Sequence, residues 1–126
     1  MLEYAILKPE GILVLKPNAS LSKEDFVGLS ASVDAYLADH ASIHGLLIHA
    51  EAFPGWENFP GFTAHIRFVR NHQQKIERVA LVTDSPIARV TEALAKHFIA
   101  AEIKDFPFED YDKAMNWLKI PLAGST

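Results

Sequence analysis

The sequence predicts a single α/β domain: a mostly parallel sheet of about five strands that begins with an antiparallel hairpin and has helices packed on it. Three observations carry this prediction. The chain has 126 residues, the length of one domain. Short apolar runs alternate with segments whose apolar residues recur every three or four positions, and no repeat or linker divides them. The first two apolar runs are separated only by a turn.

The first half of the chain predicts three strands and one helix. Strands are expected at Tyr4–Lys8 and Gly11–Pro17, joined by a turn at Pro9-Glu10-Gly11. A helix follows with Ser22 as its N-cap, and Leu46–Ile48 is expected to form a buried strand. The helix stripe that should face the core consists of Phe26, Leu29, Val33, Tyr36 and Leu37.

The second half predicts alternating helices and strands. A helix is expected over Thr63–Ile76, a buried strand over Val79–Val82, and a further helix opened by Asp84-Ser85-Pro86. Glu102–Phe106 is more polar and should lie near an edge of the sheet. A final helix should be capped by Asp110 and ended by Pro121.

Composition excludes several kinds of site. The chain has no cysteine, which excludes disulfides, thiolate metal sites and a cysteine nucleophile. Its 12 basic and 16 acidic residues give a net charge of −4, which argues against nucleic-acid binding. Metal-ligand spacings, nucleophile motifs and phosphate loops are missing from the sequence, so no metal, cofactor or enzymatic activity is expected. Without a targeting or membrane-spanning signal, a cytoplasmic protein is expected.

Several stretches resemble a known family. The two opening strands, the helix capped by Ser22 and the Leu46–Ile48 strand resemble the STAS domain of sulfate-transporter tails and anti-sigma-factor antagonists. The ending Phe108–Leu118 is similar to the closing helix of that group. The run Trp56–Phe62, the basic helix after it and Glu77–Asp84 more narrowly resemble the bacterial SpoIIAA-like family.

The resemblance covers roughly Leu2 to Ile120 and implies one SpoIIAA-like domain over residues 1–121 with a short tail at 122–126. Regulatory STAS domains carry a phosphorylatable hydroxyl residue directly after the central strand. The matching stretch here, His49-Ala50-Glu51-Ala52-Phe53, has none, so no phosphorylation switch is carried over. The resemblance also extends to lipid-binding CRAL-TRIO domains, which implies ligand or membrane association.

The first candidate site is an aromatic segment flanked by Pro-Gly pairs. Such large side chains on an irregular segment must be buried, cover a ligand or meet a partner. One hypothesis is a lid over an apolar pocket or a wedge for a membrane surface, and packing against the core is an equally weighted alternative. The residues concerned are Phe53, Trp56, Phe59 and Phe62.

The second candidate is the helix that follows. Arg67, Arg70, Lys75 and Arg78 outweigh Glu77, and His65 and His72 add titratable groups. A helical wheel places Phe68 outside the inward stripe, beside His72 and Lys75. A basic face with one exposed aromatic suits anionic lipid head groups. A solvated outer face with Phe68 tucked under the preceding segment is the favoured alternative.

The third candidate lies at the carboxyl ends of the central strands. His49 and Glu51 follow one strand and Asp84 follows the next, and ligands of open α/β folds favour this edge. Helix capping and loop polarity explain Asp84 more simply. A small hydrolase that uses His49 with Glu51 also stays open.

The preferred hypothesis is therefore a non-enzymatic binding or regulatory domain. It would hold a small apolar or lipid-like ligand, or contact a membrane peripherally. The aromatic segment and the basic helix would make this contact. The alternative is a protein interaction module, in which the same apolar surface is a homodimer interface or binds a partner protein.

Overall fold

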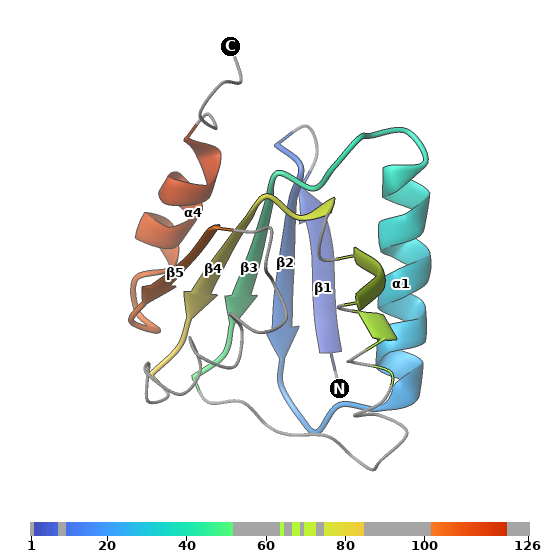
Figure 1. Cartoon of the computed structure of the whole chain (residues 1–126). Helices are drawn as coiled ribbons and strands as arrows, with labels where there is room; N and C mark the ends of the chain where they lie inside the picture. Colours follow the sequence, from blue (N-terminus) through green and yellow to red (C-terminus); the bar gives the residue numbers. More distant parts are fainter. Residues whose placement is uncertain are drawn as a thin grey trace.

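The structure is a computed structural model, and it describes residues 2–7, 10–51, 64, 67–68, 70–72, 75–84 and 102–120. Within these residues the elements follow the expected order (Figure 1): β1 (Leu2–Leu7), β2 (Ile12–Pro17), α1 (Lys23–Leu37), β3 (Gly45–His49), β4 (Arg78–Val82), β5 (Glu102–Phe106) and α4 (Tyr111–Lys119).

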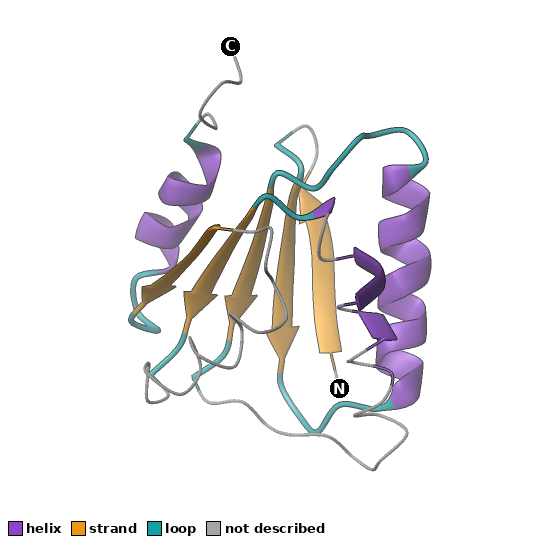
Figure 2. Ribbon diagram, viewed as in Figure 1, coloured by secondary structure: helices purple, strands orange, loops and turns teal. Residues whose placement is uncertain are grey.

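The strands form one sheet in the order β1-β2-β3-β4-β5. β1 pairs with β2 in antiparallel fashion, and β2 through β5 are parallel to one another. Figure 2 shows the five strands side by side, with α1 and α4 at opposite sides of the sheet. The predicted fold class, the opening hairpin and the edge position of β5 are confirmed.

Gly11 makes the tight connection between β1 and β2 possible. Its φ of 72° lies in the left-handed region, which glycine enters without a steric cost. In this conformation its N–H donates to the carbonyl of Leu7 at 2.8 Å. A side chain at this position would also meet the hydroxyl of Tyr36, because an added Cβ would lie 2.8 Å from Tyr36 Oη.

Ser22 is the N-cap of α1, as predicted, and it forms a capping box with Asp25. The Asp25 N–H donates to Ser22 Oγ at 3.2 Å, and the Ser22 N–H donates to Asp25 Oδ2 at 2.9 Å. Leu2 of β1 also donates its N–H to Asp25 Oδ1 at 3.3 Å. The start of the helix is therefore joined to the edge of the sheet.

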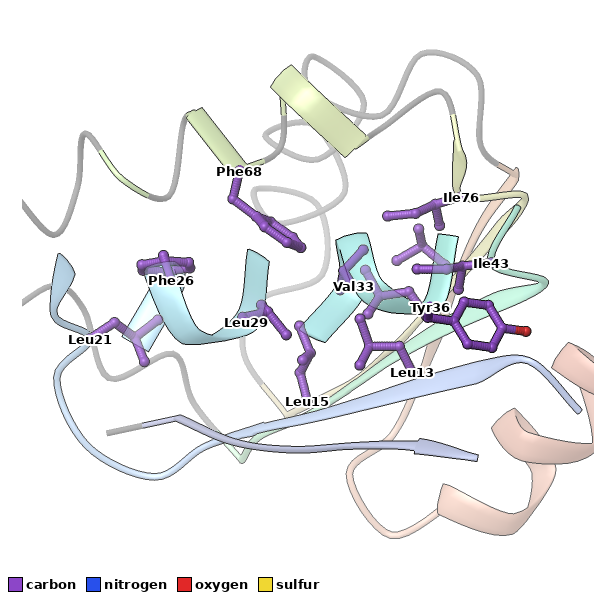
Figure 3. Packing of buried hydrophobic residues seen from close by; sticks show 12 residues of the cluster. Leu13, Leu15, Leu21, Phe26, Leu29, Val33, Tyr36, Ile43, Phe68 and Ile76 are labelled. Atoms are coloured by element: carbon purple, nitrogen blue, oxygen red, sulfur yellow. The ribbon is translucent and has the colours of Figure 1, made fainter. Parts of the chain in front are cut away.

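The first core layer lies between the sheet and α1 (Figure 3). Every second residue of β2 points into it, and the predicted stripe of α1 covers it, with Leu37 packed against it but only half-buried. Phe68 reaches into the same layer from a helical segment beyond α1. The buried members are Leu13, Leu15, Leu21, Phe26, Leu29, Val33, Tyr36, Ile43, Leu46, Phe68, Ile76 and Val79.

The second core layer lies between the other face of the sheet and α4. Gly45 lets the helix approach β3, because an added Cβ would stand 2.9 Å from Leu118 Cδ2. Arg78 holds the end of α4, since its Nη1 donates to the carbonyls of Trp117 at 3.1 Å and Ile120 at 2.7 Å. The buried members are Ile12, Val14, Leu47, Ala80, Val82, Phe106, Ala114, Met115 and Leu118.

Two local predictions need correction. Asp110 is the N-cap residue of α4, but its side chain makes no capping hydrogen bond, and its Oδ2 lies 3.8 Å from Lys113 Nζ instead. The helix expected over Thr63–Ile76 does not reach its predicted end. Ala64, Arg67, Phe68 and 70–72 are helical, whereas Ile76 bridges to Ile43 beside the sheet. The helix expected after Asp84 lies outside the described residues.

Within the described residues, no helix has the length and apolar character needed to span a membrane.

Candidate functional site

The ends of β3 and β4 stay paired beyond the strands. The Ala50 N–H donates to the Val82 carbonyl at 3.1 Å. The carbonyl of Glu51 then accepts both the Thr83 hydroxyl at 3.0 Å and the Asp84 N–H at 3.1 Å. These bonds bring Glu51 and Asp84 together at the carboxyl edge of the sheet, as the sequence predicted for parallel strands.

His49 lies among aromatic side chains at this edge. Its half-buried imidazole stacks on the ring of Phe108, with 4.5 Å between centroids and 10° between planes. The ring of Tyr111 meets it edge-on at 5.0 Å. The imidazole is thus held in place by contacts with two rings from the β5–α4 connection and the first residue of α4.

Asp84 positions one of these rings. Its Oδ1 accepts the backbone N–H of Phe108 at 3.1 Å. The exposed carboxylate is therefore used to hold the chain after β5. Asp84 was also predicted to cap a helix after β4, and that helix lies outside the described part of the chain.

We call these five residues the carboxyl-edge cluster: His49, Glu51, Asp84, Phe108 and Tyr111. Sequence reasoning found the first three and missed Phe108 and Tyr111. The signal was available, because both follow the last predicted strand and the carboxyl ends of parallel strands share one edge. What was lacking was the order of the strands, which places β5 next to β4.

The cluster does not have the geometry of an acid–base pair. Among the described residues, no hydrogen bond or ion pair joins His49 to Glu51 or to any other carboxylate. A general base needs a hydrogen bond to the group that orients it or to the proton that it removes. Nor do three potential metal ligands come together anywhere in the part of the chain that the structure describes.

The basic helical segment differs from the expectation at one residue. The helical wheel placed Phe68 outside the inward stripe, and the lipid hypothesis needed it to be exposed, whereas the favoured alternative tucked it under the preceding segment. Only 4% of Phe68 is exposed, and its ring lies 6.5 Å from that of Phe26. The exposed placement is wrong because this segment lies beside α1 and Phe68 points into the core layer there (Figure 3). His72, one turn further along, is buried as well and contacts the ring of Phe68. Arg67 and Arg70 are exposed, as expected.

The remaining predicted site residues fall outside the described part of the chain. They are Phe53, Trp56, Phe59, Phe62 and His65.

Comparison with known proteins places the chain in a family. The family model described as SpoIIAA-like matches residues 12–119. No curated protein matches the sequence.

Two solved structures are similar over nearly the whole chain. One is an uncharacterised protein of the DUF3478 family with a SpoIIAA-like fold from Shewanella loihica PV-4, at 21% identity and a TM-score of 0.72; the match covers 94% of this chain and 92% of that one. The other is the Bacillus cell fate determinant SpoIIAA in its phosphorylated form, at 12% identity and a TM-score of 0.61, with 94% and 99% covered.

At these identities the two structures show a shared fold, and the family model confirms the resemblance seen in the sequence. The further likeness to CRAL-TRIO domains stays a prediction. The chain belongs to the SpoIIAA-like family.

Proposed function

We propose that this chain is a non-enzymatic regulatory domain that binds a partner protein through its carboxyl-edge cluster, without a phosphorylation switch. The family and the fold shared with a cell fate determinant support a regulatory binding role. The aromatic rings and the charges of the carboxyl-edge cluster support its assignment as the binding surface.

One observation carries the proposal. The ring of His49 packs against those of Phe108 and Tyr111, and each of the three is half-buried rather than sealed in the core. Preassembled aromatic side chains that keep an exposed face are typical anchors of protein interfaces, because they bury area at little cost in conformational entropy.

The charge around the rings indicates the kind of partner. Glu51 and Asp84, the two acidic members of the cluster, are exposed, and so is Glu109, which follows Phe108 in the chain. Opposite charge speeds association and selects among partners. A basic docking surface on the partner protein complements this edge.

The placement of serine and threonine residues at the carboxyl edge supports binding that does not depend on phosphorylation by a kinase. The stretch His49–Phe53 contains no hydroxyl residue. Thr83, the threonine that directly follows β4 at this edge, is buried and donates its hydroxyl to the carbonyl of Glu51. A phosphoryl group on Thr83 would replace this donor and bring negative charge among existing carboxylates.

Site-specific photo-crosslinking tests the proposal. A photoreactive phenylalanine analogue is placed at Glu51 and, as the matched control, at Asp39, an exposed acidic residue two positions beyond the end of α1. That end of α1 and the end of β3 lie at opposite ends of the sheet (Figure 1). In cells of the source organism, we expect a discrete protein adduct from position 51 and none of that mass from position 39.

The identity of the adduct decides the outcome. A single protein attached at position 51, whose purified form binds the wild-type chain, supports the proposal. Equal adducts from both positions, or no protein adduct from position 51, would overturn it.

A further inference from the structure

The face of the sheet that carries α4 is not covered evenly. α4 packs over β3, β4 and β5. Beside it, β1 and β2 form the floor of an open hollow of about 370 Å³, and Tyr111 in the first turn of α4 forms its wall. We call this the β1–β2 hollow; it is lined by Glu3, Tyr4, Ala5, Leu7, Val14, Lys16 and Tyr111.

The strand register explains which side chains the hollow contains. Glu3 lies opposite Lys16, and Ala5 lies opposite Val14. Because side chains alternate between the two faces of a sheet, these residues share one face with Leu7. The hollow therefore has an apolar floor of Ala5, Leu7 and Val14, with one acidic and one basic residue at its end.

The two charged groups are not paired with each other. Directly opposed residues of antiparallel strands have Cβ atoms about 5 Å apart, which is within reach of an ion pair. None of the ion pairs found among the described residues contains Glu3 or Lys16. The Lys16 ammonium instead lies 6.0 Å from the ring centroid of Tyr111, over the wall of the hollow.

We infer that the β1–β2 hollow binds a small zwitterion with an apolar group, of the kind represented by apolar α-amino acids. The ligand carboxylate would pair with Lys16, its ammonium with Glu3, and its apolar group would cover Ala5, Leu7 and Val14. A simple anion would meet the repulsion of Glu3, and a simple cation that of Lys16. Only a ligand with both charges at one end complements both residues.

The size of the hollow agrees with such a ligand. Its volume lies at the lower end of the range for small-molecule sites, which is about 300–1,000 Å³. It suits a molecule of amino-acid size. Tyr111 also belongs to the carboxyl-edge cluster, but ligand binding here needs no partner protein, so the two proposals can fail separately.

Three probes that share one apolar group separate the contributions of the charges. Leucine carries both charges, 4-methylpentanoate lacks the ammonium, and 3-methylbutan-1-amine lacks the carboxylate. Each is titrated into the isotopically labelled full chain at constant pH and ionic strength, and binding is followed by the amide shifts of Ala5, Val14 and Lys16. We expect leucine to bind with a dissociation constant of roughly 1 mM and the two single-charge probes to bind about threefold to tenfold more weakly.

Two charge-neutralising variants assign the contacts. Lys16→Gln should weaken leucine and 4-methylpentanoate and, because it removes a repulsion, should leave the amine bound at least as tightly as before. Glu3→Gln should weaken leucine and the amine and, for the same reason, should leave 4-methylpentanoate bound at least as tightly as before. Lys23→Gln and Glu24→Gln, which change exposed residues of α1, are the matched controls and should have no effect.

Three results would overturn the inference. The first is equal affinity for leucine and 4-methylpentanoate, which would show that only an anion is recognised. The second is loss of amine binding in Lys16→Gln. The third is the absence of saturable shifts in these amides with all three probes.

Discussion

The imidazole of His72 is held between two acceptors, the carboxylate of Asp34 and the carbonyl of Phe68. Nε2 lies 2.7 Å from Asp34 Oδ1, and Nδ1 lies 2.7 Å from the Phe68 oxygen. Because neither acceptor carries a proton of its own when Asp34 is ionised, both contacts are hydrogen bonds only when each ring nitrogen donates. The ring is buried, whereas 67% of the Asp34 side chain is exposed.

A double-mutant cycle tests this contact. His72→Ala should lower the free energy of unfolding by about 2–3 kcal/mol, because it removes a buried ring and leaves the Phe68 carbonyl without this partner. Asp34→Ala should cost only about 1 kcal/mol, since the exposed carboxylate is screened by solvent. Urea unfolding of both single variants and the double variant gives the coupling, expected at roughly 1 kcal/mol. Asp39→Ala is the control, and a coupling of zero would show that the contact contributes nothing.

Two glycine substitutions should have opposite effects on stability. Gly45→Ala places a Cβ 2.9 Å from Leu118 Cδ2, so the contact between β3 and α4 must shift. We expect a loss of about 1–3 kcal/mol. Gly28→Ala meets only Tyr4 Oη at an ordinary 3.7 Å inside α1, so it should stabilise by about 0.5–1 kcal/mol. Urea midpoints measure both, and a loss of stability in Gly28→Ala equal to that in Gly45→Ala would contradict the packing described here.

Acid stability should depend on Asp25. Burial raises the pKa of its carboxyl, but hydrogen bonds from the Ser22 N–H and hydroxyl and from the Leu2 N–H outweigh this, so the pKa lies below its ordinary value of 3.8. A lowered pKa in the folded state means that the unfolded state takes up the proton first as pH falls. The contribution of Asp25 is therefore present above pH 3.8 and is lost as pH falls through the lower folded pKa.

The matching variant is Asp25→Asn. Urea unfolding between about pH 5 and pH 2 should show a shallower fall in stability for this variant than for the wild type. Glu24→Gln, on the exposed side of the same turn, should follow the wild-type curve. Identical curves for Asp25→Asn and the wild type would contradict the role of the capping box in acid stability.

The elements could be predicted wherever the pattern depends on nearby residues. The buried strands around Leu47 and Ala80 are short apolar runs, and the N-cap at Ser22 is marked by its own side chain and the acidic first turn that follows it. Such features do not depend on what packs against them, which is why their predicted positions agree with the structure to within a few residues.

The buried face of the Phe68 segment could not be predicted in the same way. A helical wheel shows which face of the segment is the most apolar. Which face is buried depends on the neighbouring element, and here that element is α1. The contact of His72 with Asp34 joins residues 38 positions apart and shows no local signal. The stacking of Phe108 on His49 likewise required the strand order, which local patterns do not reveal.

The affinity of the crosslinked partner protein for Phe108→Ala tests the central claim most directly. Phe108 stacks on His49 at the carboxyl edge, whereas Val27, 57% exposed on α1, is the matched control. Isothermal titration should show about tenfold weaker binding for Phe108→Ala, as for an aromatic anchor, and wild-type affinity for Val27→Ala. Wild-type affinity for Phe108→Ala, with its fold confirmed by an unchanged urea midpoint, would contradict the assignment of this edge as the binding surface.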